Sequence, residues 1–331
     1  MKEMYLGIDV GNAFTKSQNT TFCSGFEGPY SEKPLFANDY LYFDNKYYVP
    51  SSVDIMYYQK DKTTDETGII LTLISIAKEL IEVFSKKEGD DRDKIQSRIT
   101  ETKNISLGAG LPVGYYTKAY VEKLLDYYNK YMANGISFSY DDYDFSFTMD
   151  LCKIYPQGYA ATLVKENRLK ELYNSYYVID IGGYTIDVAR FVDGTPADAG
   201  FSLEMGMIVM YDNIVSKVSS EFDIDLDYNT IKTVLTGGKT VLDTEVISYI
   251  FSLAKAHANS IINKLAQKGV KFSSYPSLFA GGGSLLLKKA ISDNALLSKS
   301  KIQFITDPRA NAKGYAKLIR ADFAVSRGLK K

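Results

Sequence analysis

An aspartate followed by a glycine turn occurs twice in the sequence, once near the start of the chain and once past its middle. The later copy, Val-Ile-Asp-Ile-Gly-Gly-Tyr-Thr-Ile-Asp-Val at residues 178–188, predicts a strand ending at Asp180, a tight turn and a returning strand. The earlier copy is Ile-Asp-Val-Gly-Asn-Ala-Phe-Thr-Lys at residues 8–16. The matched residues are Asp9 with Asp180, Gly11 with Gly182, and Thr15 with Thr185.

Both copies have the chemistry of a phosphate-binding turn. Because glycine has no Cβ, the backbone N–H groups of such a turn can approach phosphate oxygens closely. The preceding carboxylate can hold Mg²⁺ directly or through its waters. One Asp-x-Gly motif alone also fits an ordinary hairpin, in which such turns are common. Two copies, each opening one half of the chain, favour a duplicated phosphate clamp.

Two further stretches have residues that suit a nucleotide site. At residues 277–287 a predicted strand enters Gly281-Gly282-Gly283 and a helix leaves, which would leave backbone N–H groups for an anion and room for a flat base. A plain strand-to-helix turn is the alternative, although it needs less freedom than three glycines give. Gln157 follows Pro156 at a strand-to-helix junction and could orient a water, but a glutamine there can also simply open a helix.

Other patterns exclude several kinds of site. Residues 234–240 imitate a Walker A loop, but Thr233 stands where that motif needs glycine, and a helix is expected before it instead of a strand. His257 is the only histidine, which excludes His-based triads and multi-His metal sites; we expect it on a helix surface. Cys23 and Cys152 form neither a CxxC pair nor a disulfide framework.

The length of the chain allows two domains, and its composition indicates a folded protein. The 331 residues are 45% hydrophobic and 24% charged, enough for sizeable cores. The net charge of −1 gives no basic field for nucleic acid, so we expect DNA contact only through an adaptor. No apolar run approaches the roughly 18 residues of a membrane span, and no signal sequence opens the chain. A cytoplasmic protein without membrane contact is expected.

Hydrophobic periodicity predicts the elements that must position these residues. Helices are expected at 70–84, 117–131 and 208–222, and strands at 105–111, 138–147 and 150–155. A hairpin is expected at Asp44-Asn45, a solvated loop at 86–94, a turn between strands at 195–201, and a largely helical insertion at 223–274. The helix that begins near Asn311 carries small residues, which suit a close crossing with the helix expected at Gly158.

Together, the two Asp-x-Gly turns, the Pro-Gln-Gly junction, the triple glycine and the final small-residue helix resemble the actin-like ATPase superfamily. Their order and spacing look most like the bacterial ParM-type actins of plasmid segregation. The resemblance covers nearly the whole chain, including the Gly-Leu-Pro sequence at residues 110–112. It implies an α/β fold of two duplicated domains, each with a mixed five-stranded sheet and a small insertion subdomain, with nucleotide in the cleft between them. The expected domains are residues 1–165, with an insertion at about 25–67, and 166–331, with an insertion at about 218–274.

The resemblance also implies roles for individual residues. Asp9 and Asp180 would hold the water shell of Mg²⁺, and Gln157 would position the attacking water. The β- and γ-phosphates would be contacted by Gly11, Asn12, Thr15 and Lys16 from one side and by Gly182, Gly183 and Thr185 from the other. Gly281, Gly282 and Gly283 would carry the α-phosphate and adenosine. Many relatives contact the ribose with a glutamate; residues 212–217 have none, which leaves both ATP and GTP as candidate nucleotides.

Three classes of function occur on such a fold. A filament-forming ATPase needs only nucleotide and self-association, and would move or segregate DNA, as in plasmid partition, through an adaptor protein. A sugar or acid kinase needs a base near the γ-phosphate, a role that Gln157 cannot fill. A chaperone ATPase needs a separate peptide-binding domain, for which no sequence is expected after residue 331. We therefore expect a filament-forming ATPase, with a small-molecule kinase as the alternative.

Overall fold

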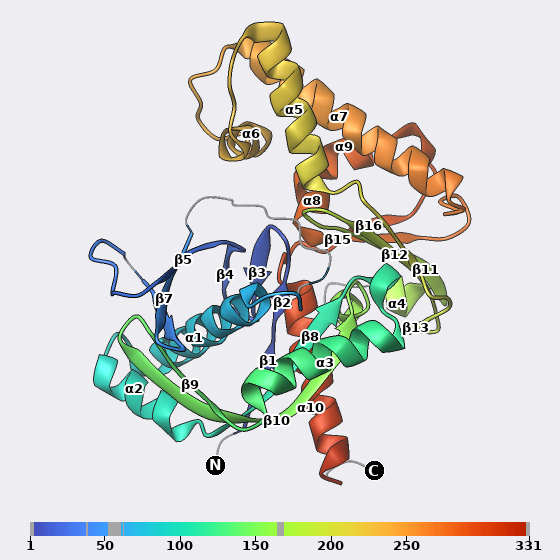
Figure 1. The fold of residues 1–331 in the computed structure, drawn as a ribbon. Helices are drawn as coiled ribbons and strands as arrows, with labels where there is room; N and C mark the ends of the chain where they lie inside the picture. Colours follow the sequence, from blue (N-terminus) through green and yellow to red (C-terminus); the bar gives the residue numbers. More distant parts are fainter. Residues whose placement is uncertain (1–2, 38, 52–60, 62, 164–168, 329–331) are drawn as a thin grey trace. The chain divides into compact units, whose positions relative to one another are not determined.

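The chain forms two compact units, which we describe separately. The computed structural model describes residues 3–37, 39–51, 61, 63–163 and 169–328 (Figure 1). Unit 1 consists of Met1–Leu111, Tyr115–Val164 and Arg309–Lys331, and unit 2 of Pro112–Gly114 and Lys165–Pro308. The C-terminal segment thus belongs to unit 1, whereas the expected second domain continued to residue 331. The expected division at residue 165 as a pair of duplicated domains stays a prediction.

Unit 1 is built on a mixed sheet with strand order β1-β8-β10-β9-β6-β7-β5. β1 and β10 both pair with β8 in parallel, whereas β9, β6, β7 and β5 continue the sheet through antiparallel pairs. A separate small sheet has the order β2-β3-β4. The strands are β1 Glu3–Gly7, β2 Asp9–Val10, β3 Phe14–Lys16, β4 Thr21–Cys23, β5 Phe26–Tyr30, β6 Leu41–Phe43, β7 Lys46–Pro50, β8 Asn104–Leu111, β9 Ile136–Tyr140 and β10 Tyr143–Pro156.

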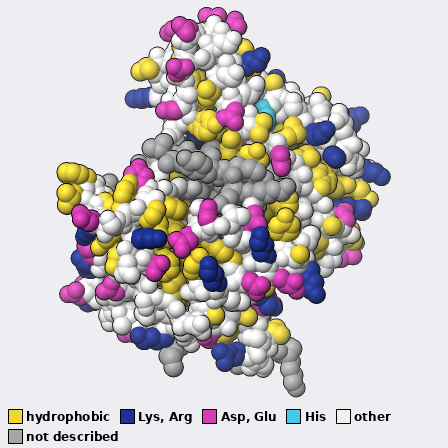
Figure 2. Space-filling view, viewed as in Figure 1, with side chains coloured by type: hydrophobic (Ala, Val, Ile, Leu, Met, Phe, Trp, Pro, Cys, Tyr) yellow, Lys and Arg dark blue, Asp and Glu magenta, His cyan; other side chains and the backbone are white. Residues whose placement is uncertain are grey.

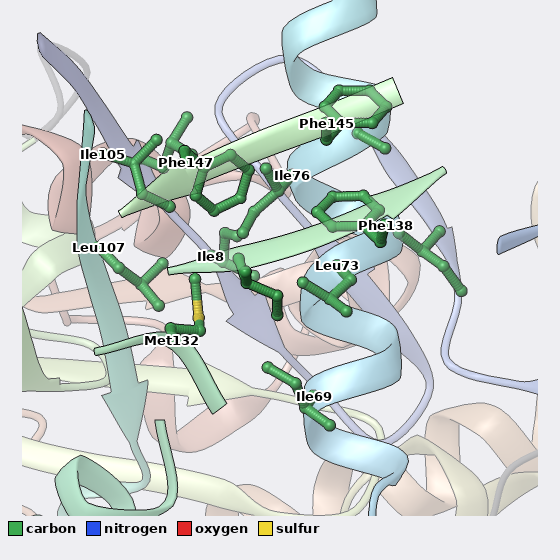
Figure 3. Close-up of a cluster of buried hydrophobic side chains, with 14 of the residues drawn as sticks. Ile8, Ile69, Leu73, Ile76, Ile105, Leu107, Met132, Phe138, Phe145 and Phe147 are labelled. Carbon is green, nitrogen blue, oxygen red and sulfur yellow. The ribbon is translucent and has the colours of Figure 1, made fainter. Parts of the chain in front are cut away.

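The helices of unit 1 cover this sheet and bury its apolar face. They are α1 Thr67–Glu88, α2 Arg92–Glu101, α3 Lys118–Met132 and α10 Ala310–Ser326, with short 3-10 turns η1 Val113–Tyr115, which spans the unit boundary, and η2 Ala160–Leu163. The apolar residues of α1 recur at helical spacing and lie against the sheet, where the Phe138 and Phe145 rings stack with centroids 4.8 Å apart (Figure 3). The helices predicted at 70–84 and 117–131 are confirmed.

Two hairpins in unit 1 turn on pairs of acidic or amide residues. Asp44 and Asn45 have φ values of 50° and 58° and join β6 to β7, which confirms the predicted hairpin. Asp141 and Asp142 have φ values of 47° and 63° and join β9 to β10. The single strand predicted at 138–147 is therefore wrong: two strands meet there at a turn made without glycine, and β10 continues through the strand predicted at 150–155. The inserted segment also pairs through β6 with β9, so it extends the sheet.

A close crossing joins α10 to η2, as the small residues predicted. A Cβ on Gly314 would lie 2.1 Å from the Ala160 carbonyl oxygen, so only glycine fits at this point of α10. The predicted helix at Gly158 is a turn followed by the short η2. The predicted loop at 86–94 is also shorter than expected, because α1 continues to Glu88, beyond which Gly89 with φ of 69° ends it, and α2 begins at Arg92.

Unit 2 has a mixed sheet of order β13-β12-β11-β15-β16, with β14 also paired to β12. Its strands are β11 Ser175–Ile181, β12 Ile186–Val192, β13 Thr195–Pro196, β14 Phe201–Leu203, β15 Ser277–Ala280 and β16 Ile302–Phe304. Its helices are α4 Leu169–Leu172, α5 Met207–Phe222, α6 Tyr228–Leu235, α7 Thr244–Gln267, α8 Gly281–Leu286 and α9 Lys288–Ser292, with the 3-10 turn η3 Ala295–Leu297. The predicted helix at 208–222 and the helical insertion at 223–274 are confirmed, and the segment at 195–201 carries the short β13 before β14.

Charges of both signs are interspersed on the face of the molecule seen in Figure 2, where no large area of one sign stands out. This agrees with the net charge of −1. Among the described residues, no helix is long and apolar enough to cross a membrane.

Candidate functional site

The first glycine turn connects β2 to β3 and brings Asp9 opposite Lys16. These two residues are antiparallel pair partners, and the Lys16 Nζ lies 4.0 Å from Asp9 Oδ2. The turn closes through the Gly11 N–H, which donates to the Phe14 carbonyl oxygen over 3.1 Å. The Asp9 side chain is buried, with 5% of the residue exposed. A buried carboxylate beside an ammonium group is thus fixed at the start of unit 1.

Gln157 completes this cluster from a distant part of the chain. Its Nε2 donates to Asp9 Oδ1 over 2.9 Å, and its backbone N–H donates to the Leu111 carbonyl oxygen over 2.8 Å at the end of β8. The structure therefore brings together Asp9, Lys16 and Gln157, three of the predicted site residues. Because the Gln157 side chain donates to Asp9, it is already oriented by the carboxylate for which a metal role was predicted.

A buried glutamate holds the β3–β4 turn that follows Lys16. Glu79 on α1 is 1% exposed and accepts hydrogen bonds from the Ser17 hydroxyl and from the backbone N–H of Asn19, the latter over 2.8 Å. Arg309 donates to the Asn19 carbonyl oxygen over 2.7 Å. Sequence reasoning missed Glu79, whose only signal was a carboxylate within the apolar stretch of a helix. Its contacts fix the strand that carries Lys16.

The second glycine turn repeats the first in unit 2. The Gly182 N–H donates to the Thr185 carbonyl oxygen over 2.9 Å, as Gly11 does to Phe14. Thr185 therefore corresponds to Phe14, and the predicted match of Thr15 with Thr185 is wrong by one position. In this register Lys16 corresponds to Asp187. The cross-strand partner of Asp180 is accordingly Asp187, a like charge where the first turn has an opposite one.

Asp187 is a buried carboxylate beside the second glycine turn that the sequence reasoning missed. It is 4% exposed and Asp180 is 6% exposed. The Thr185 hydroxyl donates to Asp187 Oδ2 over 3.2 Å, and the Ser202 hydroxyl donates to Oδ1. Its signal was present in the sequence, because a hairpin that turns between Gly182 and Thr185 must place residue 187 opposite residue 180.

The triple glycine lies directly beside Asp180. β11 and β15 are parallel neighbours in which Asp180 pairs with Ala280. Gly281 has φ of 82°, and a Cβ on it would lie 2.3 Å from Asp180 Oδ1. The predicted strand-to-helix arrangement is confirmed, since β15 ends at Ala280 and α8 begins at Gly281. The structure thus brings the second and third glycine motifs together within unit 2.

The first turn of α5 supports the second glycine turn from behind. The backbone N–H groups of Met207 and Ile208 donate to the carbonyl oxygens of Gly182 and Gly183 over 3.2 and 2.8 Å. These donors are ones that a helix start leaves without partners inside the helix. The carbonyl side of the glycine turn is thereby fixed against the helix.

The remaining sequence candidates take no part in these clusters. The Walker-like residues 236–240 follow α6 and not a strand, so the P-loop is excluded. His257 lies on α7, as expected, where it is half-buried and its Nε2 donates to the Met205 carbonyl oxygen over 3.1 Å. Cys23 and Cys152 are not joined in a disulfide, and burial raises the pKa of Cys152 to about 12.

Comparisons with known proteins show which fold this chain shares. The family model of the C-terminal part of archaeal MreB-like actin homologues matches residues 178–293, from β11 through α9. A crystal structure of the archaeal actin homologue Ta0583 aligns with a TM-score of 0.71 at 18% identity, covering 97% of this chain and 100% of that one. The chain has the actin-like fold.

Two filament structures share the actin-like fold with this chain. A 15-stranded ParM filament from Clostridium botulinum aligns with a TM-score of 0.69 at 19% identity, covering 97% of this chain and 100% of that one. An AlfA filament bound to AMPPNP aligns with a TM-score of 0.57 at 15% identity, covering 98% and 100%. Ta0583 in complex with ADP also matches, at 16% identity. No sequence among the curated proteins matches this chain.

Proposed function

We propose that this chain is an ATPase that binds Mg·ATP through both glycine turns and assembles head to tail into filaments. The observation that carries the proposal is the repetition of one turn geometry, with a buried aspartate in each copy, on an actin-like fold. Filaments of ParM and AlfA on this fold, and the complexes of its members with ADP or AMPPNP, support it. Fold alone does not give function, so the residues of the two turns decide the chemistry.

The proposed nucleotide contacts follow the two turns. Backbone groups of Gly11, Asn12 and Thr15 and the Lys16 ammonium would contact phosphate from unit 1, and Gly182, Gly183 and Thr185 from unit 2. Gly281, Gly282 and Gly283 would lie along the α-phosphate and adenosine. Lys16 supplies the positive charge, and Glu79 keeps its strand in place. Competition between ATP and GTP for binding measures which of the two nucleotides the chain prefers.

The residues fit a magnesium ion that arrives with the phosphates. Asp180 and Asp187 are opposed like charges, an arrangement that costs free energy and that a divalent cation would offset. Within the described part of the chain, no cluster of three or more His, Cys, Asp or Glu side chains is present that would hold a metal unaided. Mg²⁺ is commonly held by one or two carboxylates plus substrate phosphates. We propose that Asp9 and Asp180 hold its water shell, where it would neutralise phosphate charge.

Gln157 is proposed to orient the water that attacks the γ-phosphate. Its side-chain amide donates to Asp9 through Nε2, which leaves Oε1 as an acceptor for a water proton. An amide cannot remove a proton from a sugar or acid hydroxyl, which disfavours the kinase alternative. Transport or segregation of DNA, as in plasmid partition, through a DNA-binding adaptor in the cytoplasm is the biological role that we propose for such a filament.

Assembly is the decisive test. Purified protein at tens of micromolar with Mg·AMPPNP should sediment at high speed and scatter light, because a head-to-tail contact that does not close gives an open polymer. With ADP or with EDTA it should stay in the supernatant. Nucleotide binding without sedimentation across ordinary salts would discard the filament and favour the small-molecule kinase.

A further inference from the structure

A chain of hydrogen bonds runs from the second glycine turn to residues 112–114. It begins at the Thr185 hydroxyl, which donates to Asp187 Oδ2. The other carboxylate oxygen accepts from the hydroxyl of Ser202, the middle residue of β14. The Ser202 Oγ in turn accepts from the Gly114 backbone N–H over 3.1 Å. All four residues belong to unit 2.

Residues 112–114 are a distinctive part of the chain. Pro112–Gly114 belong to unit 2, although the segments on either side, up to Leu111 and from Tyr115, belong to unit 1. The backbone therefore enters unit 2 for three residues and leaves again, and we call this segment the crossing. The crossing is covalently continuous with β8 of unit 1 through Leu111.

The crossing is closely packed as well as hydrogen-bonded. A Cβ on Gly114 would lie 2.6 Å from Ser202 Oγ and 2.9 Å from Ser202 N. A Cβ on Gly200 would lie 2.3 Å from Val113 Cγ1. Side chains larger than hydrogen at 114 and 200 would thus push the crossing away from β14. Such proximity lets the Ser202 hydroxyl bridge a backbone N–H and a carboxylate.

We propose that Asp187 is a positioning residue that links Thr185 of the second glycine turn, through Ser202, to the crossing. The inference rests on the proposed function, because it takes Thr185 as a phosphate-contacting residue. When a phosphate oxygen accepts the hydrogen bond of the Thr185 hydroxyl, Asp187 loses that donor. The hydrogen bond from Ser202 to Asp187 then changes in geometry. Nucleotide binding in this way alters the hydrogen bond from the Gly114 N–H to Ser202 Oγ, although the nucleotide does not contact the crossing.

Hydrogen exchange at the crossing tests the link. Pro112 has no amide, so a peptide over residues 112–115 reports Val113, Gly114 and Tyr115 alone. The full-length protein, kept dilute enough to stay monomeric, is compared with and without Mg·AMPPNP. In the wild type, nucleotide should alter exchange at Gly114. Ser202→Ala should raise Gly114 exchange about 5-fold, the size of one neutral hydrogen bond, and should abolish the response to nucleotide.

Two further variants distinguish transmission through the Ser202 hydroxyl, the relay, from a general local destabilisation. Ser202→Thr keeps the hydroxyl and should restore the nucleotide response. Asp198→Asn alters the carboxylate that accepts from the Gly200 N–H over 2.9 Å, in the same loop but away from Asp187, and should leave the response intact. A full response in Ser202→Ala, or an equal loss in Asp198→Asn, overturns the inference. If Ser202→Ala does not fold, Asp187→Asn must reduce the response, and a full response there overturns it too.

Fluorescent-ATP titration distinguishes the two levels of the proposal. If the wild type binds no Mg-nucleotide, the proposed function fails and the inference falls with it. If the wild type and Ser202→Ala both bind Mg·ATP but exchange at Gly114 is the same with and without nucleotide in the wild type, only the relay is wrong.

Discussion

At the scale of single residues, the two glycine turns have the same backbone and different chemistry. Asp9 faces Lys16, whereas the equivalent Asp180 faces Asp187. The first turn therefore carries a carboxylate beside an ammonium group, whereas the second carries two opposed carboxylates. We expect the second turn to attract a cation more strongly than the first.

Removal of Asp180 should abolish metal-dependent nucleotide binding. Asp180→Ala leaves Asp187 as the only carboxylate of the opposed pair, so the turn loses most of its attraction for Mg²⁺. Titration of fluorescent ATP with and without Mg²⁺ should show a wild-type gain in affinity that the variant lacks. Asp225→Ala, on an exposed residue of unit 2, serves as control. Unchanged Mg²⁺ dependence in Asp180→Ala would refute the metal assignment.

Removal of the Gln157 side chain should separate binding from hydrolysis. In Gln157→Ala the Asp9 carboxylate loses one donor but keeps Lys16, so nucleotide affinity should change little. Phosphate release should fall by ~10²-fold or more, the scale of losing a water-positioning group. Single-turnover phosphate release and nucleotide titration measure the two effects. A wild-type rate would show that another residue orients the water.

At the scale of elements, the sequence predicted what strong patterns determine. The helices around Leu73 and Tyr211 were predictable because apolar residues recur every three to four positions. The turn at Asp141-Asp142 was missed because a pair of aspartates carries neither the glycine nor the asparagine that usually marks such a turn, whereas Asp44-Asn45 has an asparagine. In the candidate site, Asp9 and Asp180 could be singled out from their sequence motif. Asp187 could be identified only from the exact strand register, and Glu79 only from the packing of α1.

The close contact between α10 and η2 should not tolerate a side chain at Gly314. Gly314→Ala would place a methyl group 2.1 Å from the Ala160 carbonyl oxygen, which must displace the helix. Such overpacking costs about 1–3 kcal/mol of unfolding free energy. Gly282→Ala is the control for stability, because a Cβ there has no atom within 4 Å. Thermal or urea unfolding should show a lower free energy of unfolding for Gly314→Ala alone. Equal stability of the two variants would contradict the close packing of α10 against η2.

His257 should make the folded protein less stable in mild acid. Burial lowers its pKa below the ordinary value, so the unfolded chain takes up a proton more readily than the folded one. Stability is therefore retained above about pH 6.5 and is lost as pH falls below it. Unfolding of wild type and His257→Gln, compared at about pH 7.5 and about pH 5.5, measures this. The wild type should lose more than the variant; an equal loss would show that His257 contributes nothing.

At the scale of the whole molecule, the C-terminal helix is grouped with unit 1 and not with the unit that carries the second glycine turn. Motif order predicted two halves in succession, and duplication of the glycine turn made that division natural. Ala312, Tyr315 and Ile319 are buried and α10 lies against β1 and β8, so the C-terminal segment packs with unit 1, while the division near residue 165 into duplicated domains stays a prediction. No local pattern in α10 distinguishes the sheet of unit 1 from that of unit 2, because both offer an apolar face of the same kind.

The return of the chain to unit 1 has a mechanical consequence. β1 and α10 both belong to unit 1, and the main body of unit 2, Lys165–Pro308, lies between them in the sequence. Tension applied through β1 and α10, as in an optical trap, must therefore pull unit 1 apart before it reaches Lys165–Pro308. The unit that carries the second and third glycine motifs is shielded from such loads until the unit that carries the first has opened.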